Sequence, residues 1–217
     1  MQVEISNSED SKTLTDKEIF TKIWLSPRKV FKFINDQQYD RYVYLLLALA
    51  GIANAFDRAV SRDLGDKMSL WGIIMLCFFV GGFLGWISIY IYAGLISWTG
   101  KWLKGEGNSS SILRILSYAL IPIIVAMIFL VPQIGIYGKE MFKSDGDITS
   151  AGLIPNFIFY GTMILEFVLA IWTIVLCVVA VAEVQKFSIA KSILNLLLPV
   201  FLIGVPILII ILWIYSI

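Results

Sequence analysis

The sequence contains no histidine, and this absence excludes several kinds of active site. Ser-His-Asp triads, Cys-His pairs and histidine-bound metal centres all need the missing imidazole. Cysteine is almost as scarce. Cys77 and Cys177 stand alone inside apolar stretches, and two cysteines make neither a disulfide framework nor a zinc site. We therefore expect a protein without a metal or a cofactor.

Charged residues are also scarce, and apolar residues take their place. Charged residues make up 15% of the 217 residues and hydrophobic residues 59%, whereas a soluble domain carries about 25% charged residues. A core of this chain length could not bury so much apolar surface. The 17 basic and 16 acidic residues leave a net charge of +1, which argues against a nucleic-acid partner. These numbers predict an integral membrane protein whose surroundings are the lipid bilayer.

Hydropathy divides the chain into five apolar segments of the kind that cross membranes as helices. They cover Tyr42–Val60, Met68–Trp98, Ile112–Ile134, Phe157–Ala182 and Ser192–Ile214. The second segment is longer than a bilayer requires, and its glycine cluster at Gly81, Gly82 and Gly85 is where we expect it to bend. The expected fold class is an all-α membrane protein. It is a five-transmembrane-helix bundle over residues 42–217, preceded by an amphipathic cytoplasmic N-terminal segment.

The distribution of basic residues predicts the orientation, because cytoplasmic loops carry an excess of Lys and Arg. Twelve basic residues fall on the side of the N-terminus and five on the other side. The twelve are Lys12, Lys17, Lys22, Arg28, Lys29, Lys32, Arg41, Lys101, Lys104, Arg114, Lys186 and Lys191. The five are Arg58, Arg62, Lys67, Lys139 and Lys143. This bias predicts a cytoplasmic N-terminus and an external C-terminus.

The N-terminal segment divides into a polar tail and a pair of short helices. Residues 1–14 are rich in Ser, Glu, Asp and Lys, which predicts disorder. Thr15 and Glu18 have the spacing of a capping box. Ser26 and Pro27 are typical of a second helix start, with serine as the N-cap. We expect residues 15–41 to form amphipathic helices.

Aromatic and basic side chains in this segment favour a place in the membrane interface. The interpretation assigns lipid-facing roles to Trp24, Phe31, Arg28, Lys29 and Lys32. A second interpretation stays open, in which the apolar faces of these helices dock on the bundle.

Three motifs follow one another along the chain. The first is Ile-Trp-Leu-Ser-Pro-Arg-Lys-Val-Phe at 23–31. The second is Gly-Glu-Gly-Asn-Ser-Ser-Ser at 105–111, followed by Tyr-Ala-Leu-Ile-Pro at 118–122. The third is Trp172 with Glu-Val-Gln-Lys-Phe-Ser-Ile-Ala-Lys at 183–191. In this order they resemble bacterial proteins of the Yip domain family, a family named for membrane proteins that interact with Ypt/Rab GTPases. The resemblance covers residues 19–214.

Glu166 is the one acidic residue well inside an apolar segment. A charge at that depth is costly, so the carboxyl should be protonated, paired or facing water. We consider it an intramembrane functional candidate together with Asn54 and Asn195, which should bond across helices. Candidate partners of Glu166 are Tyr90, Tyr92, Tyr118, Asn54 and Asn195.

Small residues and prolines mark expected helix-packing positions. Gly81 and Gly85 form a GxxxG spacing, which suits close packing within the bundle or a homodimer face. Pro122, Pro199 and Pro206 fall inside apolar segments and should kink their helices.

The resemblance implies a non-enzymatic protein with a membrane-organising or adaptor role in the bacterial inner membrane. Its partner would be a second copy or an unidentified membrane or cytoplasmic protein. A different hypothesis is a small transporter or channel component that uses Glu166. An enzyme is the weakest hypothesis, because the sequence shows no clustered acid–base set and no catalytic residue.

Overall fold

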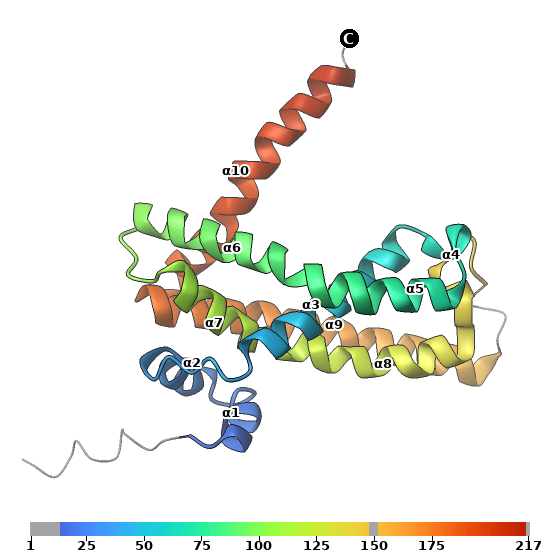
Figure 1. The fold of residues 1–217 in the computed structure, drawn as a ribbon, viewed down its shortest axis with the longest axis horizontal. Coiled ribbons are helices and arrows are strands. Elements are labelled where there is room, and N and C mark those ends of the chain that lie inside the picture. The colour runs from blue at the N-terminus through green and yellow to red at the C-terminus, as the bar shows by residue number, and fades with distance from the viewer. Residues whose placement is uncertain (1–13, 148–151, 216–217) are drawn as a thin grey trace, which may run out of the picture.

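The computed structural model describes residues 14–147 and 152–215, and the regular structure of this part of the chain is helical (Figure 1). Within it, five helical stretches are long and apolar enough to cross a membrane, as the sequence predicted. They are Val43–Ser61, Leu70–Trp102, Ser109–Phe142, Leu153–Gln185 and Ile189–Trp213. The chain is an all-α membrane protein. The predicted disorder of residues 1–14 concerns a segment that, apart from Leu14, lies outside the described residues.

Two short helices, α1 (Asp16–Lys22) and α2 (Pro27–Asp36), precede the spans. The Thr15 side chain accepts a hydrogen bond from the Glu18 amide, and Glu18 bonds back to the Thr15 amide, which confirms the capping box. Ser26 precedes α2 but its side chain makes no capping hydrogen bond, contrary to its predicted role. The helix begins there because Pro27 fixes a helical φ where no amide donor is needed.

The apolar faces of α1 and α2 dock on the bundle, which corrects the predicted lipid-facing role of the aromatic residues. Phe31 is 0% exposed, and Trp24 packs partly buried against the same core. The amphipathic pattern correctly identified the apolar face, but α7 and α9, and not lipid, cover this face of α2. Arg28, Lys29 and Lys32 remain exposed.

The first span, α3 (Val43–Ser61), crosses the second at glycine residues. The second span consists of α5 (Leu70–Leu76), a π-helical turn η1 (Cys77–Gly81) and α6 (Gly82–Trp102). A β-carbon on Gly81 would lie 2.7 Å from Cβ of Ala55, and one on Gly85 would overlap the Gly51 backbone. The GxxxG spacing therefore serves packing within the bundle. The π-helical turn η1 in the second span ends at Gly81, the first residue of the predicted glycine cluster.

The third span is divided, unlike the predicted continuous segment. It consists of α7 (Ser109–Ala119), α8 (Ile121–Tyr137) and the 3₁₀ turn η2 (Gly138–Phe142). Pro122 lies in the first turn of α8, directly after the break between α7 and α8, where its missing amide costs no helical hydrogen bond. Pro132, inside α8, is the proline at which this span lacks a helical hydrogen bond.

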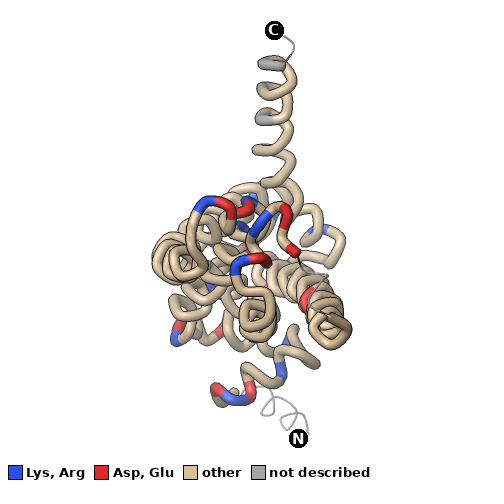
Figure 2. Tube along the Cα trace, turned by 90° about the vertical axis from the view of Figure 1, so that its right-hand side faces the viewer, with Lys and Arg blue, Asp and Glu red and all other residues tan. Residues whose placement is uncertain are grey.

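The last two spans are α9 (Leu153–Gln185) and α10 (Ile189–Tyr215). Helices α3, α5, α6, α8 and α9 run side by side, whereas α10 packs on α6 and α9 with its first half and then rises away from the bundle (Figure 1). Pro199 and Pro206 lie inside α10 as predicted. After Lys191, α10 carries no charge, and its tube is free of charged residues in Figure 2.

The basic residues of the predicted cytoplasmic side gather at one end of the molecule. Arg28 of α2 pairs with Glu183 at the end of α9, and Arg114 of α7 pairs with Asp40 before α3. At the opposite end, Asp66 of α4 (Leu64–Lys67) accepts a hydrogen bond from the hydroxyl of Ser144. The two groups of basic residues thus occupy two ends of the bundle; Lys12 lies outside the described residues.

Candidate functional site

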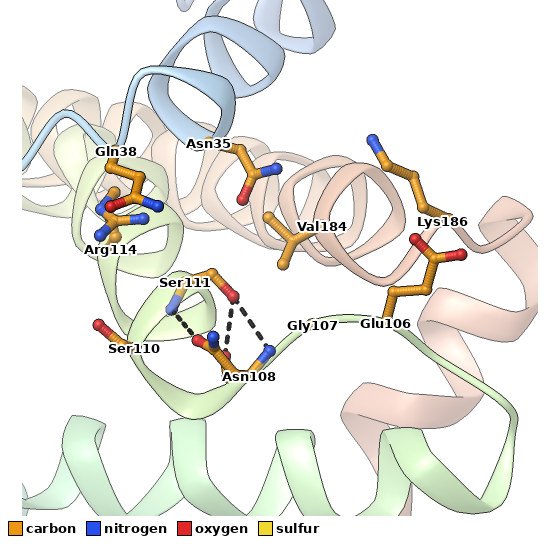
Figure 3. Close-up of a pocket in the computed structure, with 10 residues that line it drawn as sticks. All are labelled: Asn35, Gln38, Glu106, Gly107, Asn108, Ser110, Ser111, Arg114, Val184 and Lys186. Atoms are coloured by element: carbon orange, nitrogen blue, oxygen red, sulfur yellow. Dashed lines mark hydrogen bonds between the residues drawn. The ribbon is translucent and has the colours of Figure 1, made fainter.

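A polar recess of about 350 Å³ lies beside the N-terminal helices. Three separate parts of the chain form it: the end of α2 with the turn after it, the loop before α7 with its first turns, and the end of α9 (Figure 3). Most lining side chains are amides, hydroxyls or charged groups. They belong to Asn35, Gln38, Glu106, Gly107, Asn108, Ser110, Ser111, Arg114, Val184 and Lys186.

A reciprocal cap fixes the loop wall of the recess. The Asn108 side chain accepts a hydrogen bond from the Ser111 amide at 2.8 Å, and the Ser111 hydroxyl oxygen accepts one from the Asn108 amide at 3.1 Å (Figure 3). These bonds satisfy amides that the first turn of α7 leaves without helical partners. The start of α7 is therefore fixed by the loop sequence itself.

Ion pairs connect the recess to the N-terminal segment. The Arg114 guanidinium donates to both carboxylate oxygens of Asp40, at 2.6 and 3.2 Å, and its side chain is only 9% exposed. The Asp40 side chain is 61% exposed, and the two-point contact makes the pair more directional than a single hydrogen bond would. Glu183 takes part in two further pairs, with Arg28 at 3.5 Å and Lys186 at 3.2 Å.

Beneath the recess, the buried side chain of Gln185 joins three segments. Its Oε1 accepts a hydrogen bond from the Gly107 amide at 2.9 Å, and its Nε2 donates to the Ile96 carbonyl and to Oδ1 of Asn195, each at 3.4 Å. Asn195 donates onward to the Ile96 carbonyl and to the Thr99 hydroxyl. One side chain thus fixes the loop before α7, helix α6 and helix α10 relative to α9.

Glycines make room for this amide. A β-carbon on Gly100 or Gly105 would overlap the Gln185 side chain, and one on Gly107 would lie 2.7 Å from Cγ1 of Val184. The glycine-rich loop is therefore shaped to the end of α9. A larger residue at Gly100 or Gly105 would displace the Gln185 side chain from its hydrogen-bond partners.

Toward the other end of the molecule, the side chain of Glu166 in α9 contacts α8. Its carboxylate oxygen Oε1 accepts a hydrogen bond at 2.9 Å from the side chain of Gln133, which also donates to the Thr162 hydroxyl at 2.8 Å. Asp57 of α3 lines the same recess of about 330 Å³ as Glu166. The partner of Glu166 is Gln133, which was not among the predicted candidates.

A comparison with known protein families shows which family the chain belongs to. The family model described as the Yip1 domain matches residues 21–211. The chain belongs to the Yip1 domain family. No curated protein and no solved structure matches it.

The three motifs that carried the resemblance contact one another at the end of this Yip1 domain that holds the polar recess; the second and third line the recess, and the first pairs with the third beside it. The motif at 23–31 supplies Arg28, the glycine-rich motif supplies Gly107, and the last motif supplies Glu183 and Gln185. Arg28 pairs with Glu183, and the Gly107 amide binds Gln185. Arg28 and Glu183 are 155 residues apart in the sequence and Gly107 and Gln185 are 78 apart. These distant segments form one structural unit, which makes this end the candidate site.

Two predicted polar residues have different environments in the Yip1 domain. Asn195 bonds across helices, as predicted. Asn54 instead donates to the Ala50 carbonyl of its own helix at 2.9 Å, which corrects its predicted role. The prediction overlooked Gln185 and Gln133. Two features of the sequence could have pointed to Gln185. It is a polar residue at the end of an apolar segment, and the chain also contains a glycine-rich loop with room for its side chain.

Proposed function

We propose that this Yip1 domain protein is a non-enzymatic adaptor of the bacterial cytoplasmic membrane. In this role it binds a soluble protein on the face formed by α1, α2 and the loop before α7. The observation that carries the proposal is the docking of the N-terminal helices. Their apolar faces are buried on the bundle, while the end of α2 lines an open polar recess.

The chemistry of the recess supports binding over catalysis. Its amide and hydroxyl groups, on Asn35, Gln38, Ser110 and Ser111, donate and accept hydrogen bonds without preference for a single charge. The charged side chains of Arg114 and Lys186 already have acidic partners. Such a surface suits the backbone and polar side chains of a protein segment.

An exposed apolar residue in the N-terminal segment supports the proposal. Leu25, in the turn between α1 and α2, is 90% exposed. An exposed apolar side chain that a partner covers can serve as an anchor of an interface. The basic excess at this end supports a cytoplasmic location of the face under the charge rule for membrane proteins.

Photo-crosslinking in living cells tests the adaptor role. A benzophenone amino acid replaces Ser110 at the recess or Leu25 in the turn between α1 and α2. In a control chain it replaces Trp71, which is exposed in α5. We expect a cross-linked protein adduct of one defined mass at the first two positions and not at the third. Filling the recess by Asn35→Arg with Gln38→Arg should abolish the Ser110 adduct. Equal adducts at all three positions, or none at Ser110 and Leu25, would refute the adaptor role.

Transport is a second candidate function, favoured by the position of Glu166. Glu166 and Asp57 line one recess within the spans, and Gln133 bonds to Glu166 from the neighbouring helix. Purified protein in liposomes should then conduct an ion or proton flux that Glu166→Gln abolishes. An absence of flux in the unsubstituted protein would refute transport and leave the adaptor proposal untouched.

A further inference from the structure

A second recess, larger and mainly apolar, lies between α3 and the second span. Its volume is about 570 Å³. Its wall on the second span consists of aliphatic side chains, among them Leu76, Val80 and Leu84. Gly51, Gly81 and Gly85, where the two spans approach most closely, belong to the same recess. The result is an apolar groove along the bundle.

The mouth of this groove is strongly basic. Arg58 and Arg62 both line it, one helical turn apart at the end of α3. Both are exposed, and within the described ranges neither takes part in an ion pair. Asp57, next to Arg58 in sequence, lines the recess of Glu166, and Asp63, next to Arg62, forms no ion pair with it. Among the described residues, the two guanidinium groups thus line the groove mouth without an acidic partner.

We propose that this groove binds one anionic phospholipid, with an acyl chain between α3 and α6 and the phosphate at Arg58 and Arg62. Guanidinium groups match phosphate oxygens in geometry and charge. From Arg62 to Gly51, α3 rises by about 16 Å, which is close to half the roughly 30 Å hydrocarbon core and so to one leaflet. The groove thus has the length of a lipid tail and the charge of a headgroup site.

Charge complementarity favours a lipid over a second copy of this chain. The exposed part of α10 is one apolar surface that a second copy could offer. After Lys191, α10 has no acidic residue, so it would fill the groove and leave both arginines without a partner. An anionic lipid can contact the apolar wall with an acyl chain and pair with both arginines through its phosphate.

Native mass spectrometry of the full chain in mild detergent tests the site. The probes are a phosphatidylglycerol and a phosphatidylcholine with identical acyl chains, added at equal concentration. We expect the unsubstituted protein to retain one phosphatidylglycerol in preference to phosphatidylcholine. Because two charge-assisted contacts are lost, Arg58→Gln with Arg62→Gln should weaken phosphatidylglycerol retention by about tenfold or more.

Two further variants separate the site from general surface charge. Lys101→Gln with Lys104→Gln removes the same charge at the other end of the molecule and should leave retention unchanged. Ser88→Phe places a large side chain in the groove at an exposed position and should reduce retention although both arginines remain.

The proposal is overturned if the arginine variant retains phosphatidylglycerol like the unsubstituted protein. It is also overturned if the lysine variant loses as much retention as the arginine variant. A dimer that forms without bound lipid and that Ser88→Phe dissociates would show that a second copy occupies the groove, and would refute the lipid site.

Discussion

Gln185 is the residue that holds the candidate site together. It is 1% exposed, and its side chain bonds to backbone or side-chain groups of three other segments. Replacing it by leucine keeps the volume approximately but leaves the buried Gly107 amide without an acceptor. We expect Gln185→Leu to cost about 1–3 kcal/mol of stability, measured by thermal or denaturant unfolding in detergent. Gln38→Ala, at the exposed rim of the recess, is the matched control and should change stability little.

Substitutions of Glu166 test whether the protein needs a charge inside its membrane spans. The Gln133 amide donates to Oε1 of Glu166, and a glutamine at position 166 would still offer an acceptor oxygen there. Glu166→Gln should therefore unfold at nearly the same temperature as the unsubstituted protein. Glu166→Ala should be less stable by about 1 kcal/mol, because Gln133 keeps only its bond to Thr162. If both variants lose the same stability, the ionised carboxylate itself is required.

Asp16 makes the docking of α1 sensitive to acid. Hydrogen bonds from the hydroxyls of Tyr39 and Tyr42, with the charge of Arg41, lower the pKa of Asp16 from its usual 3.8. A lowered pKa in the folded state means that the stabilisation is complete above 3.8 and is lost as the pH falls through the lower folded value. The bond from Lys22 and the capping box lower the pKa of Glu18 to about 2, so its contribution is lost in the same direction.

We therefore expect α1 to detach as the pH falls from about 4 toward 2. Spin labels at Lys17 and Lys104, in a chain without its native cysteines, report the separation through electron–electron distance measurements. Asp16→Asn should show part of the acid-induced separation already at pH 7, whereas Asp36→Asn, at the exposed end of α2, should not. A distance that stays constant down to pH 2 would contradict the role of Asp16.

At the scale of elements, the contact between α3 and the second span depends on glycine. A β-carbon at Gly51 would overlap the carbonyl oxygen of Gly81, and the overlapping atoms are backbone, so no side-chain movement relieves them. Gly51→Ala should cost at least about 1–3 kcal/mol, seen as a lower unfolding temperature in detergent. Gly161→Ala is the matched control in α9, where a β-carbon has open space. Equal stability of the two variants would refute the close crossing.

The positions of the helices could be predicted from the sequence better than what covers each helix face. The apolar segments and the crossing at Gly81 and Gly85 follow from hydropathy and residue size, which are properties of the segment itself. The environment of Phe31 was not predictable, because an amphipathic pattern shows that a face is apolar but not whether lipid or protein covers it. Glu166 and Gln133 form their pair on two helices whose relative rotation the sequence does not fix.

The whole molecule has two different ends. One carries the docked N-terminal helices, the polar recess and the larger group of basic residues, and the other carries α4, η2 and the mouth of the apolar groove. The two proposed binding sites lie at these two ends. A protein partner would meet the recess in the cytoplasm, and an anionic lipid would enter the groove from the opposite leaflet. Both proposals depend on how many times the chain crosses the membrane and in which direction.

Topology in intact cells is the most direct test of this account. Single cysteines replace Lys104 beside the recess and Asp145 at the other end, and a membrane-impermeant maleimide probes them; a reporter is fused after residue 217. Five crossings with the basic end inside predict that Asp145→Cys is labelled, that Lys104→Cys is labelled only after lysis, and that the reporter is external. Labelling of Lys104→Cys in intact cells, or a cytoplasmic reporter, would contradict the five-span arrangement on which the proposed function rests.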